Sequence, residues 1–149
     1  MQHFAGSIGI ASVVMFTMVS VVVGAETDPL KPRVPPDQLA AAKALKNPVP
    51  ASPENIAKGK TLYETKGTCM NCHGAGGKGD GIAGTILNPT PRNFTNCEFE
   101  KHKTDGEMFW VIKNGIAGTG MVALVPAQIN EEEAWTIIHY ERSFCQHGG

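Results

Sequence analysis

The spacing of apolar residues predicts a helix over residues 53–65. Ser52 is a residue type that caps helix N-termini, and Pro53 is favoured at the first helical position. Apolar or small residues then recur at the three- and four-residue spacing of one helix face: Ile56, Gly59, Leu62 and Tyr63. We therefore expect this helix to bury one side against the rest of the protein.

Two further helices are predicted downstream. Residues 104–115 begin with a threonine, and residues 108–112 are apolar on every side, which is typical of a short, buried helix. Another helix should begin after Asn130, because the glutamates that follow favour a first helical turn, and it should fade near Phe144. Its buried stripe should consist of Ala134, Ile137 and Ile138.

The segments between these helices, 74–103 and 116–129, show no strand-like alternation longer than a few residues. The pattern therefore predicts an all-α domain of three main helices with long loops. Loops of this length are unusual in a compact domain. They make sense if they wrap around something large and flat.

The N-terminal third of the chain differs in composition from the rest. Residues 4–25 carry no charge, are long enough to span a bilayer, and end in small residues of the kind that an export peptidase cuts after. We expect residues 1–25 to be either an export signal cut after Ala25 or a retained membrane tether. Both interpretations place the remaining chain outside the cytoplasm, in the periplasm or on the outer face of the cytoplasmic membrane.

Residues 26–51 hold six of the ten prolines in the chain and are predicted to form a semi-rigid linker. Within it, QLAAAKAL has the propensity for a short helix. The domain itself is predicted over residues 52–149. The net charge of -1 gives no basic excess, so nucleic acid is not expected as a partner.

The stretch CMNCHGAGGKG, residues 69–79, allows four interpretations. A phosphate-binding loop would follow a strand, whereas a helix is predicted before this one. A closed zinc site needs four ligands, and the remaining cysteines are single and far apart. A redox dithiol of the thioredoxin kind would follow a strand and begin a helix. The fourth interpretation, covalent attachment of one haem c through Cys-x-x-Cys-His, fits the motif as it stands.

In that interpretation Cys69 and Cys72 form thioethers with the haem, because one helical turn presents both sulfur atoms to the porphyrin edge. His73 then supplies a nitrogen ligand to the iron. We expect Met121, in the glycine-rich loop before the last helix, to be the second axial ligand. A histidine, with His102 as the candidate, and an open iron site are the alternatives. Met108 is expected to fill space in the core.

With this motif in place, residues 52–145 resemble the class I c-type cytochromes. The order of elements matches: a helix with Gly59 and Tyr63, the haem motif, a loop rich in glycine and proline, a methionine loop and a closing helix. The resemblance implies that the first and last helices cross closely, with Ile137 and Tyr140 at the crossing.

The resemblance also implies a proline carbonyl that accepts the ring N–H of the iron-binding histidine. Pro89 and Pro91 are the candidates, and we favour Pro89. In addition, PRNFTNCEF is similar to a segment of some bacterial members in which a cysteine accompanies one near the C-terminus. Cys97 and Cys145 would then form a disulfide, as an even remaining pair in an oxidising compartment also suggests. Two free thiols are the alternative.

We therefore expect a one-electron carrier with redox proteins as donor and acceptor, and no catalytic residues of its own. The alternative is a haem c subunit held permanently in a larger membrane or periplasmic oxidoreductase. A gas-binding haem with an open site is a third interpretation. Six residues are expected to exclude water from the haem: Leu62, Trp110, Val111, Ile112, Leu124 and Ile138.

Overall fold

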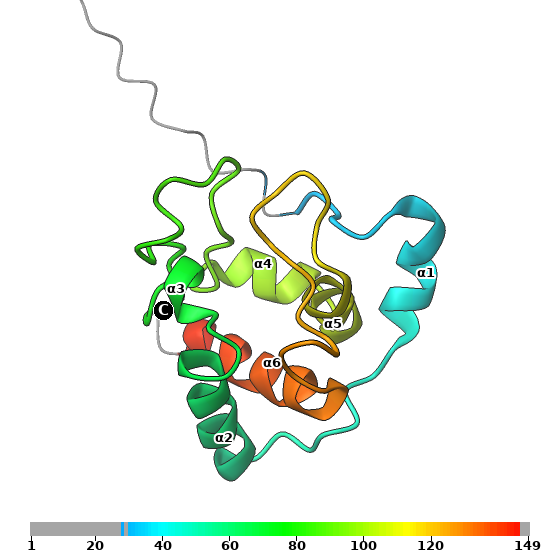
Figure 1. Ribbon diagram of the computed structural model, residues 1–149. Helices are drawn as coiled ribbons and strands as arrows, with labels where there is room; N and C mark the ends of the chain where they lie inside the picture. Colours follow the sequence, from blue (N-terminus) through cyan, green and yellow to red (C-terminus); the bar gives the residue numbers. More distant parts are fainter. Residues whose placement is uncertain (1–27, 29, 147–149) are drawn as a thin grey trace, which may run out of the picture.

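The computed structural model describes residue 28 and residues 30–146, and it confirms the all-α fold. Six helices and no strand occur in this part of the chain (Figure 1): α1 Pro36–Ala44, α2 Pro53–Glu64, α3 Met70–His73, α4 Cys97–His102, α5 Asp105–Asn114 and α6 Glu131–Gln146. None of the described helices is both long and apolar enough to cross a membrane. The predicted export signal or tether of residues 1–25 lies outside the described residues.

The three long helices begin where their capping residues predict. The Ser52 hydroxyl accepts a hydrogen bond from the Asn55 backbone N–H at the start of α2. Thr104 and Glu107 form a reciprocal capping box at the start of α5. At the start of α6, the Asn130 side chain accepts a hydrogen bond from the backbone N–H of the third glutamate. These local signals explain why the predicted and observed helix starts agree.

Helices α2 and α6 cross and make the most extensive helix–helix contact in the described part of the chain (Figure 1). Gly59 makes the close approach possible, because a Cβ at this position would overlap the backbone carbonyl oxygen of Thr136. Tyr63 and Tyr140 pack beside it in an edge-to-face arrangement, with ring centroids 5.2 Å apart. The close crossing and three of its four predicted residues are thereby confirmed, and the fourth, Ile137, is fully buried on α6.

Helix α5 covers α6 on another side through a stack of Phe109 on Trp135, whose ring centroids are 4.0 Å apart. Among the residues predicted to exclude water, Ile112, Leu124 and Ile138 are buried. The other three, Leu62, Trp110 and Val111, are half-buried.

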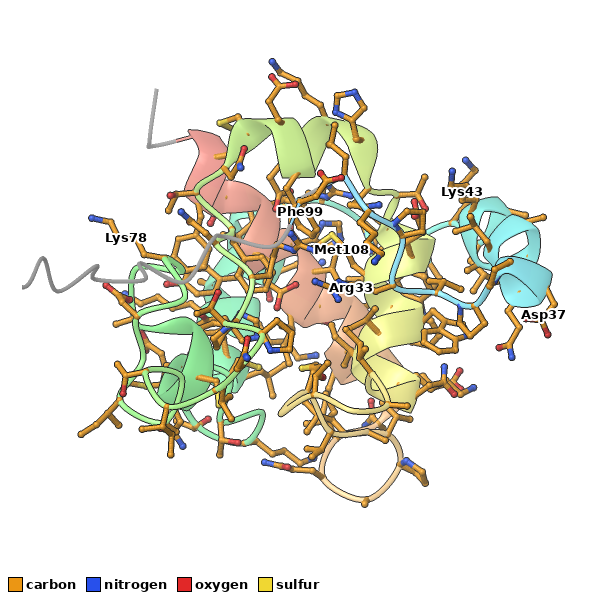
Figure 2. All side chains as sticks on the ribbon, turned by 90° about the horizontal axis from the view of Figure 1, so that it is seen from above. Arg33, Asp37, Lys43, Lys78, Phe99 and Met108 are labelled. Atoms are coloured by element: carbon orange, nitrogen blue, oxygen red, sulfur yellow. A yellow bond between two sulfur atoms is a disulfide. The ribbon has the colours of Figure 1, made fainter. Side chains whose placement is uncertain are left out.

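The segment predicted as a linker instead packs on the domain. Val34 and Ala42 are only 4% and 2% exposed. Helix α1 lies beside α5 at the edge of the molecule, and Figure 2 shows Asp37 on its outer side while Arg33 lies near Met108. The prediction treated the prolines as spacers, but their fixed backbone also suits an extended chain that follows a surface.

Candidate functional site

The cysteine motif forms one tight helical turn between α2 and the long loop that follows. Helix α2 ends near Thr65, and the Gly67 backbone N–H closes the end of the helix by donating to the carbonyl oxygen of Leu62 at 2.7 Å. Cys69 is the N-cap of the next turn, α3, and the His73 N–H donates to the carbonyl oxygen of Cys69 at 2.9 Å. Because Cys69 and Cys72 are three residues apart on this turn, their sulfur atoms face the same side.

The loop after α3 folds back over the turn and satisfies its backbone carbonyls. The N–H groups of Gly79, Gly81 and Ala83 donate to the carbonyl oxygens of the α3 residues His73, Cys72 and Asn71 at 2.8, 3.1 and 2.9 Å. In addition, the hydroxyl of the fully buried Tyr63 donates to the Gly74 carbonyl oxygen at 2.8 Å. These contacts hold a short turn that would not be stable alone.

The ring of His73 is held in one orientation. Its Nδ1 lies 3.0 Å from the backbone carbonyl oxygen of Arg92, and its face stacks on Phe94 with ring centroids 4.5 Å apart. A carbonyl oxygen can only accept a hydrogen bond, so Nδ1 carries the hydrogen and Nε2 keeps its lone pair. Burial lowers the pKa of His73 below its ordinary value, so that the neutral ring is favoured.

This geometry corrects the prediction for Pro89. The carbonyl that accepts the His73 N–H belongs to Arg92, three residues further along the loop. Pro89 and Pro91 line the cavity beside the ring instead. The loop between His73 and Arg92 folds into two turns. The spacing in the sequence does not show how these turns shorten the path, and so it does not show which carbonyl reaches His73.

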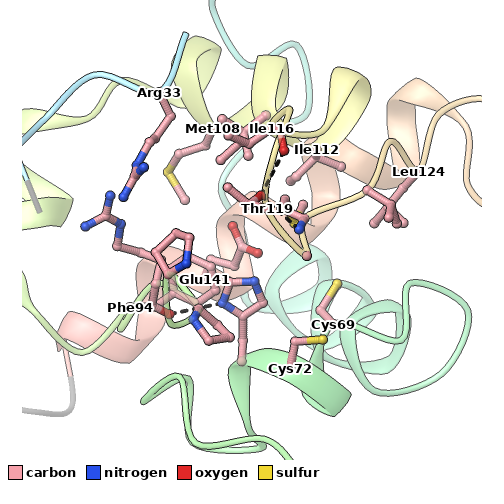
Figure 3. Close-up of a pocket in the computed structure, with 18 of the residues that line it drawn as sticks. Arg33, Cys69, Cys72, Phe94, Met108, Ile112, Ile116, Thr119, Leu124 and Glu141 are labelled. Carbon is pink, nitrogen blue, oxygen red and sulfur yellow. Dashed lines mark hydrogen bonds between the residues drawn. The ribbon is translucent and has the colours of Figure 1, made fainter. Parts of the chain in front are cut away.

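One cavity lies over the α3 turn (Figure 3). The side that carries Cys69, Cys72 and His73 we call the attachment wall, residues 69–94. The side formed by α5 and the loop after it we call the methionine wall, residues 108–124. Most of the cavity lining is apolar, and the methionine wall contributes Met108, Val111, Ile112, Ile116, Met121 and Leu124.

Met121, the expected ligand, and Met108, expected to fill space in the core, both line the cavity across from the cysteines. Met108 belongs to α5 and is buried, whereas Met121 is half-buried in the loop. His102 is exposed on α4, outside the cavity lining, and its ring Nδ1 lies 2.8 Å from the carbonyl oxygen of Glu98. The structure thus brings Met121 to the cavity and leaves His102 outside it.

The cavity also has a polar edge, which the sequence pattern does not reveal. Three cations line it, and one of them, Lys103, lies 3.7 Å from the carboxylate of Glu107 in a buried ion pair. Arg92 places its guanidinium over the ring of Phe99, 5.0 Å from the centroid. The third, Arg33, comes from the segment before α1. Nothing local in the sequence marks Arg33, because its segment is held by hydrogen bonds from Lys103 and Trp110, about seventy positions away in the chain.

Sequence reasoning also missed Glu141. It lies on α6, is only 4% exposed, and lines the cavity (Figure 3). Burial, assisted by the charge of Glu100 and opposed by Arg142, raises its pKa to about 8. The carboxyl group is therefore mostly neutral at pH 7.

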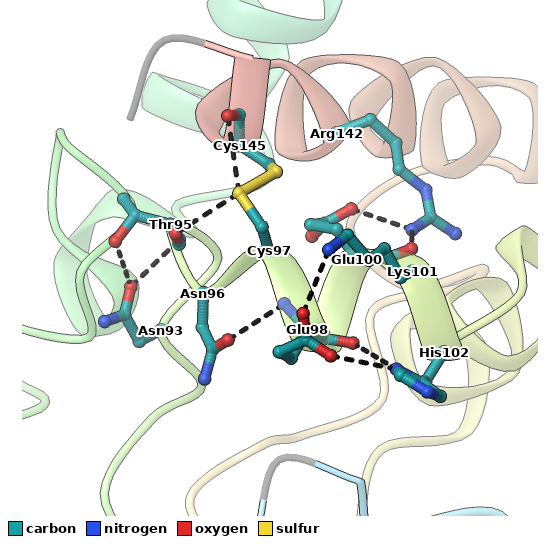
Figure 4. The surroundings of a disulfide bond; sticks show 10 residues. All are labelled: Asn93, Thr95, Asn96, Cys97, Glu98, Glu100, Lys101, His102, Arg142 and Cys145. Carbon is teal, nitrogen blue, oxygen red and sulfur yellow. Dashed lines mark hydrogen bonds and ion pairs between the residues drawn. A yellow bond between two sulfur atoms is a disulfide. The ribbon is translucent and has the colours of Figure 1, made fainter. Parts of the chain in front are cut away.

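Cys97 and Cys145 are joined by a disulfide in the structure, with Cα atoms 5.2 Å apart (Figure 4). The bridge connects the start of α4 to the end of α6. Beside it, the Arg142 guanidinium donates to the carboxylates of Glu100 and Asp105, both at 2.8 Å. The long loop of the attachment wall is therefore fastened to the last helix at its far end.

The residues at the cavity fit a covalent haem. Cys69 and Cys72 are reduced thiols on one turn, facing an apolar cavity beside a neutral imidazole. Burial raises the pKa of the Cys69 thiol well above its ordinary value, the opposite of what a reactive redox dithiol requires. The cations of the polar edge suit the carboxylates of a porphyrin.

Residues 54–140 match the family described as cytochrome c oxidase, cbb3-type, subunit III. The match spans more than half of the chain, so the protein belongs to this family of c-type cytochrome domains. The resemblance to class I c-type cytochromes is thereby confirmed. Membership implies an electron-transfer domain that binds haem c covalently.

A solved structure of the Kuenenia stuttgartiensis reducing HAO-like protein complex contains a similar chain. It is 26% identical, superposes with a TM-score of 0.57, and the alignment covers 67% of this chain and 49% of that one. The present chain therefore matches about half the length of that relative. No curated protein matches the chain.

Proposed function

We propose that this protein carries one electron at a time between redox proteins outside the cytoplasm, on one covalently attached haem c. The observation that carries the proposal is the α3 turn. Its two thiols face one cavity together with the His73 ring, whose Nε2 is left with a lone pair because Nδ1 donates to the Arg92 carbonyl.

In this proposal Cys69 and Cys72 would hold the haem through thioethers, and His73 and Met121 would bind its iron as the axial ligands. The bound haem supplies a reversible one-electron couple between ferrous and ferric iron. The protein contributes the rigid attachment wall, which fixes the His73 ring, and an apolar cavity that excludes water. Because the same ligands would serve both oxidation states, little rearrangement would accompany each transfer.

The second candidate is a haem c subunit held permanently in a larger oxidoreductase. The family description names an oxidase subunit, and the similar solved chain belongs to a protein complex. Purification under mild conditions separates the two candidates. A detergent-free monomer that exchanges electrons with several small redox proteins supports the carrier, whereas stable co-purification with an oxidase or dehydrogenase supports the subunit.

The proposed location is the periplasm or the outer face of the cytoplasmic membrane, reached through residues 1–25 as a cleaved signal or a tether. The uncharged residues 4–25 and the Cys97–Cys145 bridge both favour an exported, oxidising setting. Mass analysis of the mature N-terminus distinguishes cleavage from retention.

The attachment test uses the full chain produced in a host that matures c-type cytochromes. After denaturation and acidic solvent extraction, pigment should stay with the polypeptide, with one iron per chain and a one-electron redox titration. The double variant Cys69→Ser, Cys72→Ser should release or lack pigment. The matched control Cys97→Ser, Cys145→Ser removes the other two sulfurs and should keep it. Pigment extracted from the unmodified protein would refute the proposal.

A further inference from the structure

Residues 30–49 form a strap that is fastened to the domain at several separate points. The Lys103 ammonium donates to the Leu30 carbonyl oxygen at 2.8 Å, and the Trp110 ring N–H donates to the Gln38 side chain at 2.8 Å. Further along, the Asn47 side chain donates to the Trp135 carbonyl oxygen at 3.0 Å. The strap precedes the family match over residues 54–140, so membership does not account for it.

The strap buries little apolar surface of its own. Most residues of α1 are exposed, and Ala42 is the buried residue of this helix. Its carbonyl fits against Gly106, where a Cβ would overlap it. Outside the helix, the buried residue of the strap is Val34, which lines the cavity together with its neighbour Arg33. The strap therefore contributes Arg33 and Val34 to the edge of the cavity.

The cations of that edge differ in their partners. Lys103 forms the buried ion pair with Glu107, and the Arg92 guanidinium lies over the ring of Phe99. Among the described residues, no carboxylate lies within ion-pair distance of the Arg33 guanidinium. A half-buried guanidinium at an apolar cavity favours an anionic partner.

The position of Arg33 in the cavity determines which edge of a bound haem it would contact. Figure 3 shows Arg33 at the side of the cavity away from Cys69 and Cys72. In haem, the rings that carry the vinyl groups lie across the porphyrin from the rings that carry the propionates. With the vinyl groups bonded to the cysteines, the propionate carboxylates would face the edge that Arg33 occupies.

We propose that the strap is a haem-binding element and that Arg33 binds a haem propionate. Arg33, which lies outside the matched domain, would then close this edge of the cavity. This inference rests on the proposed covalent haem. The positive charge beside the porphyrin disfavours the ferric state, which carries one more positive charge than the ferrous state. Arg33 therefore raises the midpoint potential.

The experiment uses the full, haem-loaded chain and three variants. Arg33→Gln removes the charge, and Arg33→Lys keeps it without the fork of donors. Lys31→Gln is the matched control, because it removes a charge from an exposed strap residue outside the cavity lining. The readouts are the midpoint potential and the rate at which thermolysin cuts the strap.

In Arg33→Gln, we expect the equilibrium constant for reduction to fall about three- to tenfold, where tenfold corresponds to about 59 mV for a one-electron couple. Lys31→Gln should shift it less than about twofold, because solvent screens its charge. The equilibrium constant of Arg33→Lys should lie between those of the other two variants. Thermolysin should cut the strap fastest in Arg33→Gln. Haem attachment that fails in Arg33→Gln but succeeds in Arg33→Lys would also support the assignment.

Equal potentials in Arg33→Gln and Lys31→Gln, with haem attached in both, would overturn the role of Arg33 and leave the proposed function standing. A wild-type protein without covalent haem would overturn the proposed function itself.

Discussion

The two walls of the cavity are held in different ways. On the attachment wall, hydrogen bonds from the following loop converge on the carbonyls of the α3 turn, and Tyr63 adds one from α2. On the methionine wall, the loop is bonded largely to itself: the Ile116 N–H donates to the Met121 carbonyl oxygen at 2.8 Å, and the Met121 N–H donates to the Thr119 hydroxyl at 3.1 Å. The hydrogen bonds that shape the loop around Met121 thus come from the loop itself, and the two walls should respond to substitution separately.

The largest difference should appear between two single variants of the methionine wall, in which either Met121 or Met108 is replaced by alanine. Met121→Ala should abolish the sulfur-to-iron absorption band of the oxidised protein and lower the midpoint potential, because a thioether ligand favours the ferrous state. The haem should stay attached, since the cysteines belong to the other wall. The absorption spectrum and a redox titration measure these effects.

Met108→Ala is the matched control, because both methionines line the same cavity. Met108 is buried on α5, so its truncation should keep the absorption band and lower the free energy of unfolding by about 2–5 kcal/mol. A band that survives in Met121→Ala and disappears in Met108→Ala would exchange the two roles.

The sequence allowed prediction of the elements whose causes are local. The caps at Ser52, Thr104 and Asn130 and the cysteine motif depend on residues a few positions apart, and the three long helices follow from them. Helix α4 was missed, because its six residues follow Asn96 inside a stretch without helical periodicity. The packed strap, Arg33 and the Arg92 carbonyl were also missed, since each depends on contacts between distant segments.

Loss of the disulfide just beyond the attachment wall should have the next largest effect. Cys97 and Cys145 are 48 residues apart, and closing such a loop contributes about 4 kcal/mol in the chain-entropy model. We expect the variant Cys97→Ser, Cys145→Ser to lose up to about this much free energy of unfolding and to keep the absorption band. Denaturant unfolding measures the loss. Reductant should destabilise the parent protein and leave the variant unchanged; an equal response in both would contradict the bridge.

Between the walls, Glu141 should make stability depend on pH. Its pKa is raised from 4.5 to about 8, so the unfolded chain releases the proton first as pH rises. The contribution of Glu141 to stability therefore falls between about pH 4.5 and 8, by on the order of 1.4 kcal/mol per pH unit. Glu141→Gln should reduce this slope.

The surroundings of Glu141 set the control for that measurement. Glu100 on α4 and Arg142 act on its charge, and Tyr63 on α2 and Cys69 respond to it. The pKa of Glu100 is itself raised to about 7 by burial, so some slope should remain in the variant. Glu131→Gln, at the exposed start of the same helix, should keep the full slope. Equal slopes in the two variants, from unfolding at several pH values, would contradict the assignment to Glu141.

The smallest effect should come from one oxygen atom of α2 that supports the attachment wall. Tyr63→Phe removes the hydroxyl that donates to the buried Gly74 carbonyl at the end of α3, and keeps the ring between α2 and α6. We expect a loss of about 1 kcal/mol, rising toward 3 if no water reaches the carbonyl. Tyr140→Phe is the matched control, because Tyr140 packs against the same ring and its hydroxyl makes no hydrogen bond to the described residues. If both variants lose the same stability, the rings alone hold the crossing. If only Tyr63→Phe does, and faster amide exchange at Gly79 accompanies the loss, the hydrogen bonds over the α3 turn act together to hold the wall that carries His73.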